Sequence, residues 1–146
     1  MTARDEGLIG GVGVSNVSHR HLLTALEVTD IVCVQNVYNL ANRSSAPVLE
    51  ECTALGIPFV PFCPLGWPKA QHDAIRTDPV VNRIAASHGA TPAQVALAWL
   101  LAIADNMLLI PGTRSRDHLT ENLAAGSLSF HDDDIAGLSE ASITIP

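Results

Sequence analysis

Residues 31–40 read IVCVQNVYNL, an apolar, β-branched run that gives way to polar residues from Gln35 onward. Such a run, bounded by turn-forming residues, predicts a buried strand over residues 31–35. Three further runs of the same kind occur at 9–14, 57–62 and 107–110, and each is flanked by Gly, Pro or Asn. The sequence therefore predicts four short strands separated by longer connections.

The connections between the predicted strands carry the signals of helices. One helix is predicted over residues 19–27, with Ser18 as its N-cap, because a serine hydroxyl can accept a hydrogen bond from a free N–H of the first turn. A second is predicted over residues 47–55, and Gly56 follows it, where helices commonly end in a left-handed glycine. The first two connections are therefore expected to hold one helix each.

The third connection is longer and predicts two helices. The first begins after Asp78 and ends near Gly89, and the second begins at Thr91, which has a glutamine three residues later, as in a capping box. After the fourth strand, one helix is predicted over residues 115–125 and a last one after His131, where three successive aspartates suit the positive end of a helix dipole. The predicted order of elements is βαβαβααβαα.

Strands that alternate with helices predict a parallel sheet, because parallel strands need crossover connections. Two architectures share this pattern, an open doubly wound sheet and part of a (β/α)8 barrel, and the order of elements alone does not separate them. Gly11 and Gly13 begin a pattern similar to the glycine fingerprint of a doubly wound dinucleotide site. However, Asn16 replaces the third glycine and the glycines lie inside the strand, so we discount that fingerprint.

Composition narrows the classes of function. The chain has 146 residues, of which 47% are hydrophobic and 16% charged, which predicts one globular domain over residues 1–146. A net charge of −7 argues against nucleic-acid or membrane partners, and no apolar stretch is long enough to span a bilayer. The cysteines and histidines show no metal-ligand spacing, so no metal site is predicted, and the odd number of cysteines suggests reduced thiols in a cytoplasmic protein.

The residues at the end of each predicted strand form short motifs. They read GVSN at 13–16, QNVYN at 35–39, FCPLG at 62–66 and IPGT at 110–113, with helical segments ATPAQVALAWL at 90–100 and HLTEN at 118–122. In order and spacing, these segments resemble the GVSN, QNxYN, YSPLG and IPGT motifs of the aldo-keto reductases, from about residue 8 to the end. The resemblance implies half of a (β/α)8 TIM barrel, with four parallel strands alternating with helices, that corresponds to strands five to eight of the family.

The resemblance implies an NADP(H) cofactor at the carboxyl ends of the strands, where barrels of this kind bind their ligands. Ser15, Asn16 and Gln35 match residues that hold the nicotinamide amide, and hydroxyl and amide groups suit a carboxamide. Phe62 stands where the family has a tyrosine stacked on the nicotinamide ring. The residue types alone leave two alternatives open: Ser15 or Asn16 as the cap of the next helix, and Phe62 as a core aromatic.

The loop after the third strand and the segment after the fourth match the family's phosphate and adenine contacts. Pro64, Leu65 and Gly66 begin a loop that the resemblance places over the pyrophosphate. The segment after residue 110 also suits an anion on its residues alone, since a helix N-terminus and an arginine fork both favour phosphate. By residue match, the contacts to the 2′-phosphate and adenine are Gly112, Thr113, Arg114, His118, Glu121 and Asn122. An exposed helix face is the alternative for His118 and Glu121.

The resemblance also implies what this chain is expected to lack. The family takes its catalytic Asp, Tyr, Lys and His, with Tyr as the proton donor, from its first four strands, and this sequence is expected to begin after them. Tyr38 matches a residue near the substrate, and we interpret it as a core or wall residue. Lys69 is expected in a loop, either near the cofactor or solvated. No catalytic residue is therefore predicted, and the chain alone is expected to be inactive.

Four parallel strands leave two open sheet edges and an apolar inner face. We therefore expect a partner that supplies a second barrel half, either another copy of this chain or a separately encoded half. A truncated gene product is the third alternative. A second hypothesis belongs to a different class of function. A non-catalytic nucleotide-binding or subunit-interaction module would also lack catalytic residues.

Overall fold

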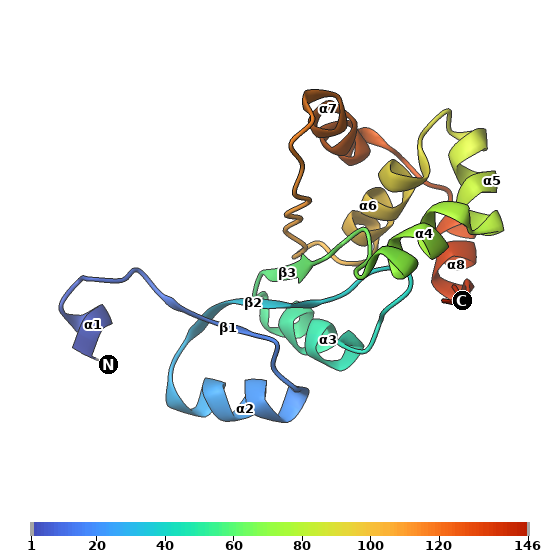
Figure 1. Ribbon diagram of the computed structural model, residues 1–146. Helices are drawn as coiled ribbons and strands as arrows, with labels where there is room; N and C mark the ends of the chain where they lie inside the picture. The colour runs from blue at the N-terminus through green and yellow to red at the C-terminus, as the bar shows by residue number, and fades with distance from the viewer. Residues whose placement is uncertain (1, 146) are drawn as a thin grey trace.

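The computed structural model describes residues 2–145 and has three parallel strands at the centre of the fold (Figure 1). The strands are β1 (Val12–Ser15), β2 (Ile31–Val37) and β3 (Phe59–Phe62), and they pair in the order β1-β2-β3. The helices are α1 (Thr2–Asp5), α2 (His19–Val28), α3 (Ala46–Leu55), α4 (Lys69–Thr77), α5 (Pro79–Ser87), α6 (Pro92–Ile103), α7 (Arg116–Ala124) and α8 (Asp132–Glu140), with a 3-10 turn at Ala125–Ser127. The predicted α/β fold with a parallel sheet is confirmed.

Most of the predicted helices begin and end where their capping residues indicated. The Ser18 side chain accepts a hydrogen bond from the first turn of α2, and Gly56 ends α3 with a left-handed φ of 67°. Thr91 begins α6 with both hydrogen bonds of a capping box, and the Ser115 hydroxyl caps α7. These caps satisfy backbone groups that the helix itself leaves free, which is why they set the helix ends.

The sheet has three strands where the sequence predicted four. Met107 forms a single parallel bridge with Phe59, the Phe59 N–H donates to the Asn106 carbonyl at 2.9 Å, and the Leu108 N–H donates to the Phe59 carbonyl at 2.9 Å. Leu108 and Ile110 are 58% and 46% exposed. Within residues 2–145, no further strand lies beyond this segment, so its apolar side chains are not buried from both faces as the sequence pattern suggested.

Helix α4 occupies residues that we expected in a loop, Lys69 among them. Its buried side consists of Gln71, Ala74 and Ile75. A helix is usually recognised in a sequence by a stripe of large apolar residues, and here a polar and a small residue take two of those positions. The helix follows Pro68, whose side chain offers no capping group. The buried side is held by hydrogen bonds to Gln71 as well as by apolar contact, and a hydrophobic pattern does not record such bonds.

The core joins β2, β3 and α6 through three aromatic side chains. Tyr38 stacks on Trp99, with ring centroids 6.1 Å apart and planes 6° from parallel, and it meets Phe59 edge-on at 6.1 Å. All three rings are buried. The guanidinium of Arg43 lies over the Trp99 ring, 4.9 Å from its centroid. Aromatic and cation–π contacts of this geometry stabilise the core beyond the burial of apolar area, and they favour one arrangement of the rings.

The last helix, α8, is fastened to the core at both ends. Arg43 donates to the carbonyl oxygens at the C-terminal end of α8, and the Trp99 indole N–H donates to the Ser139 hydroxyl at 3.0 Å. In the first turn of α8, the Asp134 carboxylate lies 2.9 Å from Nε2 of His88, and the two side chains are only 14% and 17% exposed. Cation and carboxylate therefore sit at the helix ends that favour them.

One edge of the sheet is uncovered. Within residues 2–145, β1 pairs with β2 alone, and Figure 1 shows α1 and the segment that leads to β1 reaching away from the remaining elements. Large apolar side chains near this edge and the adjoining sheet face are exposed, among them Leu8 at 72% and Val32 at 50%. The described helices include none that is both long and apolar enough to cross a membrane.

Candidate functional site

A cavity of about 570 Å³ opens between the loop after β3, helices α4 and α7, the start of α6 and the segment that precedes α7. The predicted site residues that line it are Pro64, Leu65, Gly66, Gly112, Thr113, His118, Glu121 and Asn122. The lining also includes His72 and Arg76 of α4, to which the sequence did not point. Two stretches that the sequence singled out separately, before α4 and before α7, therefore share one cavity.

A buried asparagine holds the loop that forms one wall of the cavity. The Asn39 amide is fully buried, and its Nδ2 donates to the Cys63 carbonyl at 3.0 Å and to Oε1 of Gln71 at 3.1 Å. Its Oδ1 accepts from the backbone N–H groups of Ala41 and Asn42 at 3.0 and 2.9 Å. All four hydrogen-bonding positions of the amide are thus used. Asn39 therefore ties the loop after β3 to the end of β2 and to α4.

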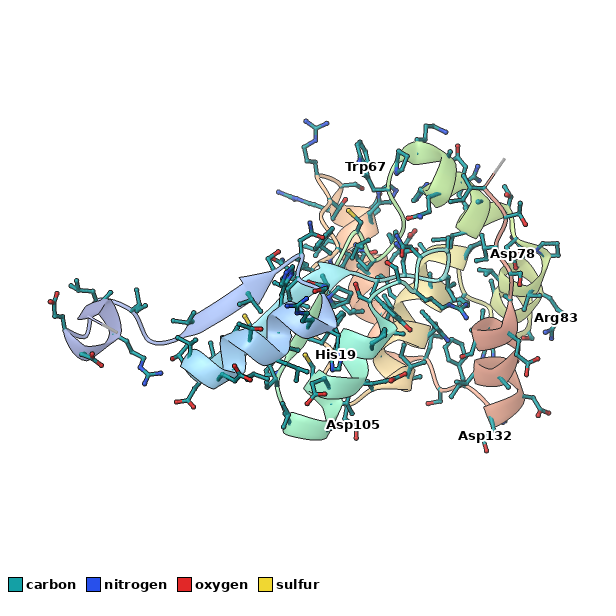
Figure 2. The ribbon with its side chains drawn as sticks, turned by 90° about the horizontal axis from the view of Figure 1, so that it is seen from below. His19, Trp67, Asp78, Arg83, Asp105 and Asp132 are labelled. Atoms are coloured by element: carbon teal, nitrogen blue, oxygen red, sulfur yellow. The ribbon has the colours of Figure 1, made fainter. Side chains whose placement is uncertain are left out.

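Gly66 brings the same loop into direct contact with α4. Its φ is 91°, and a Cβ built there would lie 2.9 Å from the backbone nitrogen of His72 and 3.0 Å from the carbonyl carbon of Gln71. Any other residue would push the loop and the helix apart. Gln71 also accepts from the Trp67 N–H at 3.1 Å, whereas the Trp67 side chain is 72% exposed at the periphery of the molecule (Figure 2). Loop and helix therefore form one packed unit.

The opposite wall consists of α7 and the turn before it. Oγ1 of Thr113 accepts from the Ser115 N–H at 3.1 Å, and Ser115 in turn caps α7. Nε2 of Gln94 donates to the Glu121 carbonyl at 3.1 Å, which joins α6 to α7. Because the first residues of α6 also line the cavity, the N-terminal ends of two helices lie at this site. Both ends carry partial positive charge, which favours an anion.

The residues predicted to hold nicotinamide lie at the strand ends, outside the lining of this cavity. Ser15 pairs with Gln35 across β1 and β2, and Gln35 pairs with Val60 on β3, two residues before Phe62. Paired residues of parallel strands point to the same face, and so does every second residue along a strand. Ser15, Gln35 and Phe62 therefore share one face of the sheet.

Asn16 follows β1 in a left-handed conformation, with φ of 53°, which asparagine tolerates better than most residues. Its N–H donates to the Gln35 carbonyl at 2.9 Å, and its side chain is exposed. The alternative that Ser15 or Asn16 caps the next helix is wrong, because Ser18 is the N-cap of α2. The exposed side chains of Ser15 and Asn16 are thus not engaged in that cap.

Two cationic side chains considered from the sequence lie outside the cavity. Arg114 follows Thr113 directly, yet it is exposed and does not line the cavity. Lys69 begins α4, is 83% exposed and forms an ion pair with Asp73. A contact between Arg114 and the 2′-phosphate stays a prediction, and of the two expectations for Lys69 the structure agrees with a solvated side chain.

Comparison with known proteins identifies the family. The model of the Aldo/keto reductase family matches residues 2–143. This chain belongs to the aldo/keto reductase family. It is 42% identical over 135 residues to pyridoxine 4-dehydrogenase of Escherichia coli K12, an alignment that covers 92% of this chain and 46% of that protein. An uncharacterized oxidoreductase of Schizosaccharomyces pombe is 35% identical over 137 residues, which cover 94% of this chain and 44% of that protein.

Solved aldo-keto reductases share the fold. A thermostable aldo-keto reductase in complex with the inhibitor epalrestat matches with a TM-score of 0.81 at 33% identity, over 94% of this chain and 50% of that one. The aldo-keto reductase of Klebsiella pneumoniae in complex with NADPH matches with a TM-score of 0.81 at 28% identity, over 93% and 49%. The chain thus spans about half the length of the relatives it matches, and its fold class is half of a (β/α)8 barrel.

The only tyrosine of this aldo-keto reductase chain is a core residue. Tyr38 is 6% exposed, and burial raises the pKa of its phenol, against a smaller opposing effect of Arg43. A general acid works best with a pKa close to the working pH, so this shift is in the unfavourable direction. Residues 2–145 also contain no group of three or more His, Cys, Asp or Glu side chains arranged to hold a metal ion.

The sequence did not reveal the residues that build the site from α4. Asn39 lies in the QNVYN segment, but nothing in the sequence indicated that its amide would bond with Gln71. His72 and Arg76 are four residues apart, a spacing that puts side chains on one face of a helix. That signal is readable only once residues 69–77 are recognised as helical.

Proposed function

We propose that this chain is the NADP(H)-binding half of an aldo-keto reductase-type oxidoreductase, which in its complete form reduces aldehydes or ketones. The observation that supports the proposal is the single cavity that gathers the loop after β3 and the segment before α7. These are the two stretches where the family resemblance puts the pyrophosphate, the 2′-phosphate and the adenine. The relative from Klebsiella pneumoniae, which forms a complex with NADPH, supports the same cofactor.

The residues of the cavity fit the phosphate and adenine end of a dinucleotide. A volume of about 570 Å³ lies within the range of ligand pockets, and two helix N-termini favour a phosphate there. The loop of Pro64, Leu65 and Gly66 would cover the pyrophosphate. The proposed contacts of the 2′-phosphate are Gly112, Thr113 and Arg114, with His118 beside it, and those of the adenine are Glu121 and Asn122.

The strand ends fit the nicotinamide end. Ser15, Asn16 and Gln35 would hold the carboxamide, since their hydroxyl and amide groups both donate and accept hydrogen bonds. Phe62, on the same face of the sheet as Gln35, would offer its ring face to the nicotinamide. When bound, NADPH supplies a hydride for a carbonyl carbon. The residues of this chain would orient the ring and leave protonation of the carbonyl oxygen to another group.

We propose that the chain alone is inactive. Tyr38 is stacked in the core, and Lys69 is paired with Asp73, so these two residues do not form the tuned Tyr–Lys pair that the family uses. A second barrel half, from another copy or a separately encoded chain, would supply the acid and cover β1 with its exposed apolar neighbours. Three free cysteines suit a cytoplasmic location, where thiols stay reduced.

The buried Tyr38 also favours a second candidate function, a non-catalytic nucleotide-binding module. Such a module would use the same cavity without any acid. Turnover in the presence of a complementing half separates the two candidates, because only the first gains carbonyl reduction.

Calorimetric titration with NADPH tests the proposed cofactor. We expect saturable binding at one site. Glu121→Ala should weaken this binding, because Glu121 lines the cavity and is proposed to contact the adenine. The matched control is Glu140→Ala, which removes an exposed carboxylate at the end of α8 and should leave the affinity unchanged. Failure of the chain to bind NADPH, or equal loss in both variants, would contradict the proposal.

A further inference from the structure

The α4 wall of the cavity carries two side chains that no family motif accounts for, His72 and Arg76. Both come from one face of the helix, with Ile75 between them in the lining. The opposite wall is formed by Thr113 and α7. A ligand in the cavity would therefore lie between the start of α7 and a cationic helix face.

The position of this helix face is set by contacts already described. Gly66 packs against the backbone at Gln71 and His72, and Gln71 is bonded to Asn39. The face thus lies directly beside the loop of residues 63–66. That loop is the one proposed to cover the pyrophosphate, so the start of α4 adjoins the part of the cavity where the pyrophosphate is proposed to lie.

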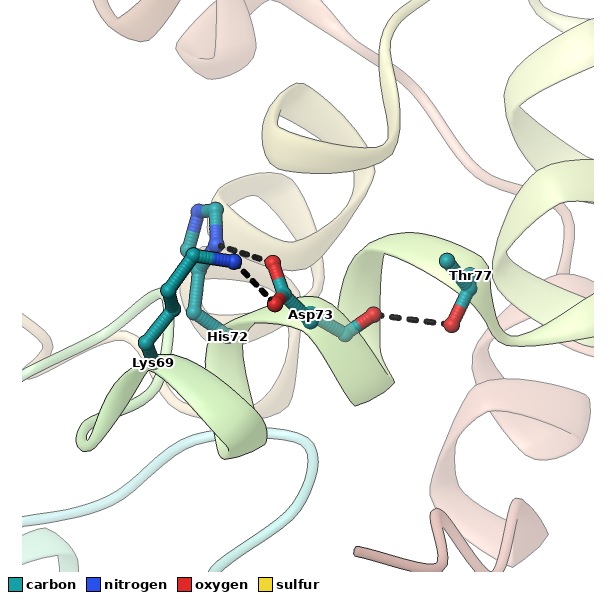
Figure 3. Close-up of polar contacts among 4 residues, drawn as sticks. All are labelled: Lys69, His72, Asp73 and Thr77. Carbon is teal, nitrogen blue, oxygen red and sulfur yellow. Dashed lines mark hydrogen bonds and ion pairs between the residues drawn. The ribbon is translucent and has the colours of Figure 1, made fainter. Parts of the chain in front are cut away.

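On α4, Asp73 contacts both Lys69 and His72 (Figure 3). Its carboxylate pairs with Lys69 and lies 3.7 Å from Nδ1 of His72, and these contacts hold its pKa below the usual value, with the Lys69 hydrogen bond as the largest cause. Within residues 2–145, no hydrogen bond or ion pair occupies the guanidinium of Arg76, which acts on Asp73 only through its charge. Arg76 lines the cavity and is exposed, and its guanidinium donors have no partner among the described residues.

The charges around the cavity favour an anion near Arg76. Among the described residues that line it, Glu121 alone carries a carboxylate, and it belongs to the opposite wall. An arginine guanidinium is a cation whose planar fork of donors matches two phosphate oxygens. The N-terminal end of α6 adds partial positive charge at the same cavity.

We propose that Arg76, assisted by His72, binds the pyrophosphate of the dinucleotide from α4. This inference rests on the proposed function, because it assumes that the cavity holds a dinucleotide. It assigns the two charged groups of the ligand, the pyrophosphate and the 2′-phosphate, to different walls. Thr113 and the start of α7 recognise the 2′-phosphate, which only NADP(H) carries, whereas Arg76 grips the pyrophosphate, which NAD(H) and NADP(H) share.

The test compares four variants of the full chain by calorimetric titration with NADPH, NADH and inorganic pyrophosphate. We expect Arg76→Ala to weaken NADPH and NADH alike, by about tenfold, the scale of one lost charge-assisted hydrogen bond. Arg76→Lys should recover part of the loss, and His72→Gln should cause a smaller one. The matched control is Arg83→Ala on α5, an exposed cation far from Trp67 and its loop (Figure 2).

The outcomes separate this inference from the proposed function. Dinucleotide binding that Arg76→Ala leaves unchanged, or weakens for NADPH alone, overturns the role of Arg76 while the proposed function stands. A chain that binds neither dinucleotide overturns the proposed function. In that case, binding of inorganic pyrophosphate that is lost in Arg76→Ala but kept in Arg83→Ala still supports an anion site on α4, and its absence overturns that as well.

Discussion

Asn39 at the end of β2 and Gln71 in α4 are joined by a hydrogen bond of 3.1 Å between two buried amides. The bond links parts of the chain 32 residues apart. Because the same Asn39 amide holds the Cys63 carbonyl, the shape of the cavity loop depends on a side chain that does not line the cavity. Affinity for a ligand and stability of the fold are therefore coupled at this position.

Asn39→Ala should lower both stability and affinity. The substitution leaves buried partners without hydrogen bonds, which costs roughly 1–3 kcal/mol for each group left unsatisfied, and it releases the loop of residues 63–66 from α4. Urea unfolding and NADPH titration would measure the two effects. Asn42→Ala is the control, since among residues 2–145 the Asn42 side chain bonds only within its own turn, to the N–H and hydroxyl of Ser44. Equal losses in the two variants would argue against a central role for Asn39.

Cofactor preference should be for NADP(H) over NAD(H), by about tenfold or more, because the 2′-phosphate gains charge-assisted hydrogen bonds of roughly 1.5–3 kcal/mol each. The preference should shrink at high salt, since the site is near the surface. Arg114→Ala should weaken NADP(H) and leave NAD(H) nearly unchanged. Titration of both cofactors in each variant measures this, and an Arg114→Ala variant that affects both alike would show that Arg114 does not recognise the 2′-phosphate.

Aldehyde reduction by the chain alone should not exceed the rate without protein. The phenol of Tyr38 is buried between Trp99 and Phe59, and its pKa is raised by burial, so it is not a suitable acid. NADPH oxidation with a simple aldehyde, followed by absorbance, is the measurement. Tyr38→Phe keeps the ring stack and should change nothing. Turnover that disappears in Tyr38→Phe would identify Tyr38 as the acid after all.

The contact between His88 and Asp134 should make the docking of α8 sensitive to acid. The hydrogen bond from His88 is the largest cause that holds the pKa of Asp134 below its usual value in the folded chain. A carboxyl group whose pKa is lowered by folding stabilises the folded state above its unfolded pKa, roughly 3.9, and this contribution disappears as the pH falls through the lower folded value. Asp134→Asn should therefore cost about 1 kcal/mol at pH 7 and less near pH 3.

Unfolding curves of the two proteins at both pH values test this expectation. A difference between wild type and Asp134→Asn that stays constant from pH 7 to pH 3 would show that the carboxylate charge does not contribute. Asp132→Asn, in the same turn of α8 but exposed, is the matched control.

Association is expected from the uncovered edge of β1. Exposed apolar side chains such as Leu8 and Val32 near an unpaired strand favour burial against another subunit or a complementing half. Sedimentation should therefore show a dimer or a larger species. Val32→Lys, at an exposed position near the start of β2, should shift the equilibrium toward monomer. A monomer of the wild-type chain that unfolds cooperatively would contradict the expectation.

The sequence predicted the elements that depend on local chemistry and missed those that depend on distant contacts. Caps such as Ser18, Gly56 and Thr91 act within one turn, so they can be read from neighbouring residues. Helix α4 is anchored through Gln71 to a residue 32 positions away, and no local pattern carries that information. For the same reason the sequence pointed to both cavity stretches but not to Arg76 beside them.

The cavity is built entirely from residues 63–122, whereas the strand ends proposed for nicotinamide include β1 and β2. The adenosine contacts proposed for this cavity are thus contiguous in the sequence and separate from β1 and β2. A recombination point between β2 and β3 would move the residues that line the cavity as a unit, together with Phe62, and would leave Ser15, Asn16 and Gln35 with the preceding part of the chain. Such a division would let descendants of this fold change their reaction while inheriting the same coenzyme.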